Sequence, residues 1–415
     1  MQAMTATERG AEADSSAWRH AGRDALARAL RASRSDTLAC FALYETHLPG
    51  LTVPQRGDLN PPLWELGHIG WFAQHWLARN PQRHLGWQAD PDALRQPALA
   101  PDNDQLFDSG RVAHDTRWGL PLPSAHALRE ALAQGLERSI ELLDRCDEDD
   151  RDLYFHRLVL AHEDMHHEAA ILMGQALGLP MDQALSGSRW PPGAASKDSA
   201  RQLAFDAGPF ELGHCGDGFA FDNELGAHTV GLSATRIDAR VVNWAEFLPF
   251  VQAGGYAQAP WWCEQGRAWL ADSGALGPRY LRAGSQAWQQ QRFGRWQALD
   301  LSQPACHLNV FEAQAWCNWA RRRLPSEAEW ERAALSSGAD WQWGAVWEWT
   351  TSDFAPYPGF EPHPYRDYSA PWFGSRRVLR GASVATQPRL HDKRYRNFYT
   401  PERNDIFAGF RSCAL

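Results

Sequence analysis

The first half of the chain carries apolar residues at the spacing of an α-helix. Leu128, Leu132, Leu136, Ile140 and Leu143 recur at steps of three and four residues, which places them on one helix face. Four segments rich in Ala, Leu and Arg predict long helices, at 24–34, 63–79, 124–144 and 152–177. Four such helices favour a bundle whose side chains project into its centre.

The ends of these helices carry recognisable signals. Ser124 precedes the third helix as an N-cap, and Gly178 and Pro180 terminate the fourth. The connection between the second and third helices, 80–123, is long and rich in proline and aspartate. A connection of that length in a compact domain is usually functional or partly disordered.

After residue 200 the pattern changes to short apolar runs separated by Gly, Asp and Pro, which are typical of strands. Such runs lie at 203–213, 228–242, 377–386 and 407–415. Three helical segments interrupt them, at 243–253, 310–323 and 325–334. In the last of these, Ser326 and Glu329 have the spacing of a capping box. The predicted fold class is α+β.

Composition shifts mark the expected domain boundaries. The first residues are small and polar, and the segment after residue 180 is rich in Gly, Pro and Ser, which is typical of a linker. We therefore expect a mobile tail at 1–17, a helical bundle at 18–180, a linker at 181–200 and a second domain at 201–415.

Charge and cysteine content exclude several classes of function. The 415 residues include 41 Lys and Arg against 50 Asp and Glu, a net charge of −9, which disfavours nucleic acid and anionic membranes as partners. No signal peptide is visible, and no apolar run approaches the ~18 residues of a membrane span. Seven scattered cysteines without a C-x-x-C motif indicate reduced thiols and a cytoplasmic location.

Histidines on apolar helices form the strongest chemical signal. His162 and His166 are spaced i, i+4, so a helix presents both imidazoles on one face, ready to bind one metal ion. Glu168 is expected to orient one of these ligands from outside, and His167 is expected to face away. The third ligand should come from another helix, where His68 is the first candidate and His75 the competitor.

Three imidazoles without a carboxylate would leave up to three open coordination positions on an octahedral ion. Such a site suits Fe(II) and O₂ chemistry, but three histidines also bind zinc. The spacing alone leaves the identity of the metal open.

The order of further motifs resembles that of the iron-dependent sulfoxide synthases of ergothioneine biosynthesis. After "HIGWF" and H-x-x-x-H-x-E come "FEAQAWCNWARRRLPSEAEWE", "VWEWT", "RVLRGAS", "YRNFY" and "FAGFR". The resemblance runs from about residue 20 to the C-terminus. It implies a DinB-like four-helix bundle joined to a formylglycine-generating-enzyme/C-type-lectin-like domain. It also implies Fe(II) held by His68, His162 and His166, and O₂-dependent bond formation at the imidazole C2 of hercynine.

The resemblance also implies roles for residues of the second half. Tyr365, in "YRDYS", matches the active-site tyrosine that supplies a proton or a hydrogen atom; the alternative is a loop tyrosine stacked on Pro364. Asn397 matches an asparagine near the carboxylate of hercynine. Phe398 takes the place of an aromatic residue that faces the quaternary ammonium group.

Several positions depart from the ergothioneine pattern. Met165 replaces a hydrogen-bonding glutamine next to hercynine, and Tyr399 replaces an acidic residue. The stretch expected to supply arginines for the co-substrate carboxylates offers only Arg111, although Arg403 matches a family arginine. This pattern resembles the selenoneine synthase branch, whose co-substrate is a 1-seleno sugar. The 21 tryptophans suit a hexose, because indole faces stack on sugar rings.

Other functions remain as alternatives. The first is an ergothioneine-type sulfoxide synthase that joins hercynine to cysteine or γ-glutamylcysteine. The second is a non-catalytic carbohydrate-binding protein. Formylglycine generation would need a reactive cysteine pair, but Cys306 and Cys317 are expected to be structural thiols. An ovothiol-type synthase usually carries an appended methyltransferase, for which the sequence offers no segment.

Overall fold

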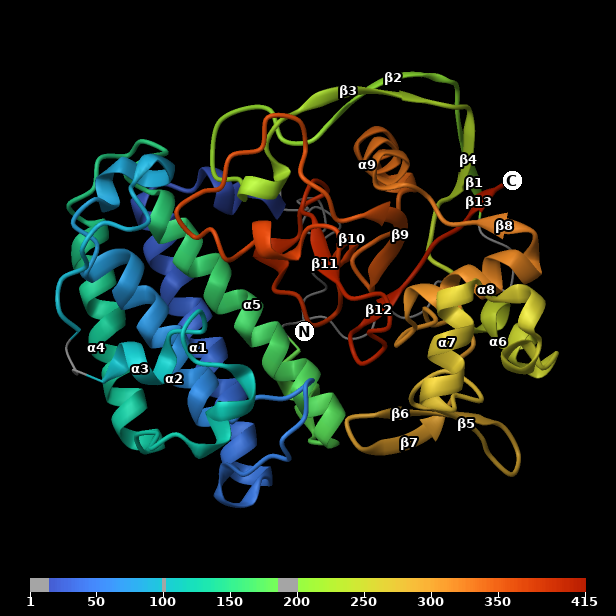
Figure 1. The fold of residues 1–415 in the computed structure, drawn as a ribbon, viewed down its shortest axis with the longest axis horizontal. Helices are drawn as coiled ribbons and strands as arrows, with labels where there is room; N and C mark the ends of the chain where they lie inside the picture. Colours follow the sequence, from blue (N-terminus) through green and yellow to red (C-terminus); the bar gives the residue numbers. More distant parts are fainter. Residues whose placement is uncertain (1–14, 99–101, 186–200) are drawn as a thin grey trace, which may run out of the picture.

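The computed structural model describes residues 15–98, 102–185 and 201–415. A helical part and a part built of small sheets and short helices lie side by side, and α5 (Tyr154–Leu177) runs along the boundary between them (Figure 1). The observed fold class is therefore α+β, as predicted. Among the described residues, none of the helices combines the length and apolar character that a membrane crossing requires.

Four long helices make up most of the helical part. The three besides α5 are α1 (Arg23–His47), α2 (Pro62–Ala73) and α4 (Ala125–Leu143), and α2 continues into a π-helical turn at Gln74–Ala78. α1 packs against α5 and α4, and α2 packs against the same two helices. The four predicted helices are thus confirmed. α1 extends well past its predicted end because buried residues continue on one face as far as Tyr44.

The predicted helix ends are confirmed in detail. The Ser124 hydroxyl accepts a hydrogen bond from the Ala127 N–H at 3.3 Å. Gly178 ends α5 in the left-handed region, with φ of 73°. A Cβ on the facing Gly294 would lie 2.3 Å from the Gly178 carbonyl oxygen. Glycine is therefore required where the end of α5 meets the second half.

The connection between α2 and α4 is folded against the bundle wherever it is described. It contains α3 (Asn103–Phe107), which packs on α2, and two 3₁₀ helices at Arg83–Gln88 and His114–Gly119. Asp104 of α3 accepts a hydrogen bond from the Trp71 indole at 2.7 Å and pairs with Arg79 at 2.6 Å. These contacts hold the connection over one side of α2.

The second half contains two four-stranded sheets. The first has the order β1-β4-β13-β8, with strands at Gln202–Phe205, Thr235–Asp238, Cys413–Ala414 and Arg322–Arg323. The second has the order β11-β10-β9-β12, with strands at Asn397–Tyr399, Arg377–Gly381, Trp347–Asp353 and Ala408–Gly409. All pairings are antiparallel except β12 with β9. The C-terminal β13 lies between β4 and β8 and pairs with both, so the end of the chain forms an inner strand of this sheet.

Two smaller sheets and four helices complete this half. The sheets are β2-β3, at Gly208–Leu212 and His228–Leu232, and β5-β6-β7, at Leu281–Ala283, Trp288–Arg292 and Arg295–Ala298. The helices are α6 (Trp244–Gln252), α7 (Glu264–Ser273), α8 (Val310–Ala320) and α9 (Glu327–Ser336). The capping box of Ser326 and Glu329 is confirmed at the start of α9.

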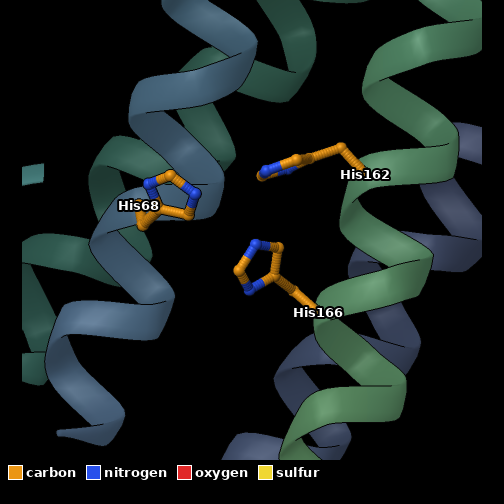
Figure 2. Close-up of side chains that lie close together, drawn as sticks. All are labelled: His68, His162 and His166. Atoms are coloured by element: carbon orange, nitrogen blue, oxygen red, sulfur yellow. The ribbon is translucent and has the colours of Figure 1, made fainter. Parts of the chain in front are cut away.

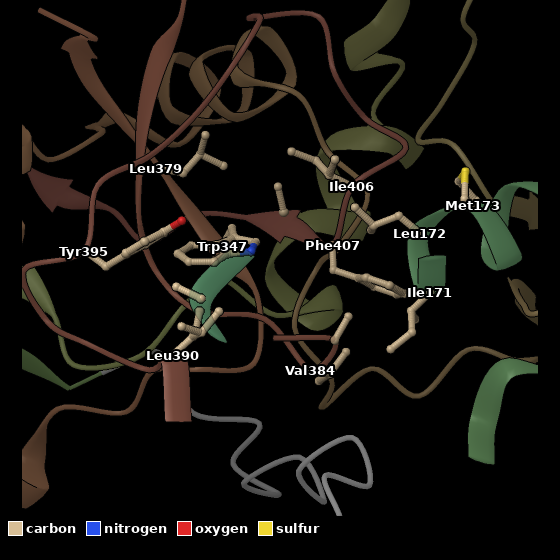
Figure 3. Close-up of a cluster of buried hydrophobic side chains, with 14 of the residues drawn as sticks. Ile171, Leu172, Met173, Trp347, Leu379, Val384, Leu390, Tyr395, Ile406 and Phe407 are labelled. Atoms are coloured by element: carbon tan, nitrogen blue, oxygen red, sulfur yellow. The ribbon is translucent and has the colours of Figure 1, made fainter. Parts of the chain in front are cut away.

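One apolar core joins the two halves. Ile171, Leu172 and Met173 of α5 belong to the same buried cluster as Trp347 and Phe407 of the second half (Figure 3). Ion pairs with buried carboxylates cross the boundary as well. Asp164 of α5 binds Arg389, and Arg19 binds Glu224. Because α5 also carries two of the predicted metal ligands, the second half fixes the position of those ligands directly.

Two predicted boundaries need correction. Residues 1–14 lie outside the described residues, but Ser15–His20 forms a 3₁₀ helix, so the predicted tail cannot extend to residue 17. This helix is ordered because Arg19 is buried and makes two 2.8 Å hydrogen bonds to Glu224. The predicted linker also starts too early, because Met181 is fully buried against Gly174 of α5. Residues 186–200 lie outside the described residues.

Candidate metal centre

His68 of α2 and His162 and His166 of α5 converge between the two helices. One ring nitrogen from each lies within 4.8 Å of the other two, and all three rings point into the same space (Figure 2). The ring centroids are 5.1 Å apart for His68 and His162, 4.9 Å for His68 and His166, and 4.4 Å for His162 and His166. Among the described residues, these three histidines are the group of His, Cys, Asp or Glu side chains whose arrangement could hold a metal ion.

A backbone carbonyl sets the tautomer of His68. Its Nδ1 lies 2.7 Å from the carbonyl oxygen of Phe107, and a carbonyl can only accept, so Nδ1 carries the proton and Nε2 keeps its lone pair. Gly67 makes this contact feasible, because a Cβ there would lie 2.1 Å from the Phe107 ring. Burial, followed by the charge of His166, lowers the pKa of His68 to about 3. The His68 imidazole is therefore neutral at pH 7.

A carboxylate orients His166 in the same way. The His166 Nδ1 lies 2.6 Å from Oε2 of Glu65, and Oε1 of Glu65 accepts a hydrogen bond from the Asn60 amide at 2.6 Å. Burial by itself raises the pKa of Glu65, but the charge and hydrogen bond of His166 outweigh it and lower the pKa. The carboxylate form therefore accepts the Nδ1 proton and leaves Nε2 of His166 free to bind.

His162 is as deeply buried as His68. Its ring stacks on Phe72 at 3.5 Å with an interplanar angle of 2°, and its Nε2 is buried without a hydrogen-bond partner. Burial lowers the pKa of His162 well below its usual value. A buried imidazole nitrogen without a partner is costly. A divalent metal bound by the three histidines would satisfy it, so the side chains present fit such an ion.

The other polar residues that the sequence suggested for this site lie outside the trio. His75 lies on the π-helical turn against Trp71 and Trp76, outside the trio. His167 faces away, with Nε2 3.2 Å from the Ala184 carbonyl oxygen. The expected role of Glu168 is wrong. Its carboxylate accepts hydrogen bonds from Trp347, Ser383 and Thr386 at 2.7 to 2.8 Å, so it anchors α5 to the second half and orients no histidine.

Tyr365 comes from the second half and lies beside the trio. Its ring centroid is 4.9 Å from that of Phe72 and 6.2 Å from that of His162. Trp76 contacts the other side of the same tyrosine, at 6.1 Å. Burial, with smaller contributions from Asp367 and Asp108, raises the pKa of the Tyr365 hydroxyl. The hydroxyl therefore keeps its proton at neutral pH.

The residues predicted to contact hercynine lie on β11 and α5. Phe398 stacks on Phe354 at 4.0 Å and contacts Tyr368 at 5.7 Å. The side-chain oxygen of Asn397 accepts a hydrogen bond from the Phe398 N–H, and its NH₂ group, a donor, hydrogen-bonds the Tyr399 hydroxyl. The Tyr395 hydroxyl lies 3.4 Å from the sulfur of Met165, one position before His166.

Tyr399 and Arg403, two of the residues predicted to contact the co-substrate, lie close together. The guanidinium of Arg403 lies 5.1 Å from the ring centroid of Tyr399. Arg403 already binds both oxygens of Asp405, at 2.5 and 2.6 Å. Arg111 pairs with Asp108 at 3.1 Å, and its side chain is 73% exposed. Neither arginine is therefore poised as an unpaired cation.

Several residues near the site were not singled out by the sequence. Besides Glu65 and the Phe107 carbonyl, they include Arg95, whose guanidinium lies 5.1 Å from the ring centroid of Trp76. Its Nε and Nη2 are buried without hydrogen-bond partners. Arg117 lies 3.7 Å from the Trp64 ring and donates to Asn60 at 2.9 Å. Both arginines belong to the aperiodic connection after α2, which offered no pattern by which to single them out.

Replacing Glu65 with glutamine tests the orienting contact. We expect Fe(II) affinity to fall about 10- to 100-fold, as for other residues that orient metal-binding histidines, while the fold is retained. Anaerobic titration with Fe(II) measures the effect. The matched control is Glu45→Gln, which changes a glutamate that pairs with Arg129. Equal affinities for wild type and Glu65→Gln would show that Glu65 does not support the site.

The cysteines give no support to a formylglycine-type reaction. Cys306 and Cys317 are both buried, and burial raises the pKa of Cys306 to about 12 and that of Cys317 as well. Neither is a thiolate at neutral pH, which agrees with the expectation of structural thiols.

Both halves of the chain are similar to known proteins. Residues 189–345 and 342–414 match the family model of the sulfatase-modifying factor enzyme 1-like domain. The hercynine oxygenase of Mycolicibacterium smegmatis is 31% identical, over 94% of this chain and 98% of its own. That of Mycolicibacterium thermoresistibile is 32% identical, over 93% and 94%. The formylglycine-generating enzyme of Streptomyces coelicolor is 28% identical, over 54% of this chain and 91% of its own.

The relatives that match both halves are hercynine oxygenases, which indicates that this chain is an oxygenase enzyme. The chain belongs to the hercynine oxygenase family, because the similarity extends over nearly the full length of both chains.

Proposed function

We propose that the protein is an Fe(II)- and O₂-dependent enzyme that bonds the imidazole C2 of hercynine to the selenium of a 1-seleno sugar. O₂ is the oxidant, the C2–H and Se–H hydrogens leave as water, and the selenium–sugar bond breaks in a later step to give selenoneine. The observation that carries the proposal is the convergence of His68, His162 and His166 beside Tyr365. In a chain of the hercynine oxygenase family, that arrangement supports oxygenase chemistry at the trio. By the same reasoning, the helical half is proposed to be a DinB-like bundle.

The trio is the proposed iron site. His68, His162 and His166 offer three neutral nitrogens and no carboxylate, which leaves open positions for small molecules and suits Fe(II). When bound, the ion supplies one-electron chemistry toward O₂. The contributions of the chain are to hold His68 and His166 each in one tautomer and to enclose the site with Phe72, Trp76 and Tyr365.

Hercynine is proposed to bind between the trio and β11. A trimethylammonium group cannot donate a hydrogen bond, so an aromatic face is its suitable partner. Phe398 and Tyr368 supply such faces. The Asn397 NH₂ group, which hydrogen-bonds Tyr399, has a second N–H that is proposed to donate to the hercynine carboxylate. Met165 adds a polarisable contact beside His166 in place of a hydrogen bond.

Tyr365 is the proposed catalytic proton or hydrogen-atom donor. Replacing it with phenylalanine removes the hydroxyl and keeps the ring contacts with Phe72 and Trp76. We expect kcat for product formation to fall about 100-fold, in the range of general acid catalysis, while hercynine affinity stays the same. Tyr357→Phe is the control, because that hydroxyl binds Glu327. An unchanged kcat for Tyr365→Phe would remove the tyrosine from the mechanism.

The charge around Tyr365 supports a sugar as the co-substrate. A Cβ on Gly110 would lie 3.2 Å from a carboxylate oxygen of Asp367 and 3.3 Å from one of Asp108, so two acidic side chains meet at the loop that carries Tyr365. Carboxylates accept hydrogen bonds from sugar hydroxyls but repel the carboxylates of a peptide donor. The pairing of Arg403 with Asp405 removes one cation that a peptide donor would need.

One observation favours the second candidate, an ergothioneine-type sulfoxide synthase. The two unpartnered nitrogens of Arg95 lie beside Trp76, which contacts Tyr365. A guanidinium in this position would suit a carboxylate of cysteine or γ-glutamylcysteine. Arg95→Met therefore separates the candidates. It should raise the KM of a carboxylate donor strongly and that of a seleno sugar little.

The test is anaerobic reconstitution with Fe(II), followed by O₂ and hercynine with each donor in turn. We expect the highest kcat/KM with a 1-seleno sugar, and selenoneine as the product by mass spectrometry. Equal or better turnover with γ-glutamylcysteine or cysteine would overturn the seleno-sugar assignment. Absence of O₂ consumption with every donor would overturn the oxygenase proposal itself.

A further inference from the structure

A small, partly open cavity lies beside His166, and residues of α1, α2 and α5 line it. These three helices pack against one another (Figure 1). Apolar side chains form most of its wall, among them Phe41, Leu66, Ile69 and Met173. His166 and Glu65 belong to the same wall. The cavity therefore touches the metal centre at the side chains of His166 and of its orienting carboxylate, Glu65.

The polar groups of the wall are mostly engaged elsewhere. The Tyr44 hydroxyl donates to the Ala170 carbonyl, and both oxygens of Glu65 accept hydrogen bonds, from Asn60 and His166. Burial raises the pKa of the Cys40 thiol to about 12, so no thiolate forms. The Thr37 hydroxyl and Nδ1 of His167 are polar atoms of wall residues without a partner. A water molecule needs two to four polar partners, so a single water near these two groups is the occupant that competes with an apolar gas.

The size of the cavity fits a diatomic molecule. The space open to the centre of a water-sized molecule is about 30 Å³, roughly twice what a single water molecule requires. Apolar cavities in proteins stay dry and take up apolar molecules such as xenon. Dioxygen is a small apolar molecule, and transfer from water to an apolar environment favours it for the same reason as any apolar solute.

We propose that this cavity is a binding site for dioxygen, from which O₂ reaches the trio past His166. The inference rests on the proposed function, because only an O₂-consuming site needs such a supply. The cavity would raise the local concentration of O₂ next to His166, while hercynine and the chalcogen donor enter from the side of Tyr365. The two kinds of reactant would then not compete for one entrance.

Xenon and a pair of substitutions at Cys40 test the proposal. Cys40 lines the cavity from α1, outside the trio. Cys40→Met fills the space, and Cys40→Ala enlarges it at the same position. Crystals of the full chain under xenon pressure should show xenon in the wild-type cavity, less in Cys40→Met and more in Cys40→Ala. In the iron-loaded enzyme, the KM for O₂ should rise about threefold or more in Cys40→Met, with kcat at saturating O₂ and hercynine affinity unchanged.

The outcomes separate this proposal from the proposed function. Xenon in the cavity with an unchanged KM for O₂ in Cys40→Met would overturn the supply route. An ordered water bound to the Thr37 hydroxyl, with no xenon, would overturn the gas site. Wild-type enzyme that consumes no O₂ with any donor would refute the proposed function and remove the purpose of the route. The xenon experiment, which needs no iron or turnover, would still report whether the cavity binds an apolar gas.

Discussion

Replacing His162 with alanine is expected to abolish iron binding and turnover. His162 is fully enclosed, its ring stacks on Phe72, and no other described side chain of a metal-ligating type completes the cluster. Only the imidazoles of His68 and His166 would remain, and no other described side chain of the group could take the place of the third ligand. We expect iron to fall from about one ion per chain to a small fraction, with an affinity loss beyond the 10- to 100-fold of an orienting residue. Activity should fall with it.

The matched control is His156→Ala on the same helix. His156 is also buried, and its Nε2 contacts Cys146 at 3.5 Å, away from the trio. Iron per folded chain, measured by plasma mass spectrometry after anaerobic loading, should stay near one in this control. Full iron in His162→Ala would contradict the site. Wild-type protein that binds sugar but retains no iron would favour the non-catalytic carbohydrate-binding alternative.

The second large effect concerns the ion pair that fixes α5 against the second half. Asp164 lies between the two histidines of α5 and is completely buried. It accepts hydrogen bonds from Arg389 at 2.5 and 2.6 Å and from Ser33 at 2.6 Å. Removing one partner of a buried pair strands the other charge, which typically costs about 3–5 kcal/mol. Arg389→Met should destabilise the protein by that amount, measured by urea denaturation.

The pH dependence of this variant follows from the same contacts. Burial raises the pKa of Asp164, and Arg389 opposes that rise. Without the arginine, the folded-state pKa rises further above the unfolded value. The stability deficit is therefore largest at neutral pH and shrinks as the pH falls and Asp164 is protonated.

Arg31→Met is the control for Arg389→Met, because Arg31 and Glu137 form an exposed pair on the bundle surface. Exposed pairs contribute little to stability, so no clear change is expected. A deficit for Arg389→Met no larger than that of Arg31→Met would contradict the role of this pair in joining the halves. Iron affinity should also fall in Arg389→Met if α5 shifts.

The histidine trio could be predicted because each member violates a local pattern. His162 and His166 share one face of a long apolar helix, and His68 is a lone imidazole in the apolar stretch "WELGHIGWF". An unexplained polar group on an apolar face requires a partner. The four helices were predictable for a similar reason, since their periodicity is long and their caps are ordinary.

The residues that orient the trio could not be predicted. Glu65 meets His166 across 101 positions of sequence, and that contact depends on how α2 docks on α5. The Phe107 carbonyl is a backbone group, which no residue type identifies. Glu168 was assigned the wrong role because sequence proximity was taken for spatial proximity. The step of two residues from His166 to Glu168 along the helix is a rotation of about 200°. Glu168 therefore faces the second half and not the histidine trio.

The most direct test of the account is the location of iron in the loaded protein. A crystal soaked anaerobically with Fe(II) and measured at the iron absorption edge gives an anomalous map that reports iron alone. We expect one strong peak about 2.1 Å from a ring nitrogen of each of His68, His162 and His166, the usual distance for divalent metals and imidazole. A peak elsewhere, or three imidazoles without iron at saturating Fe(II), would contradict the metal centre and the oxygenase function built on it.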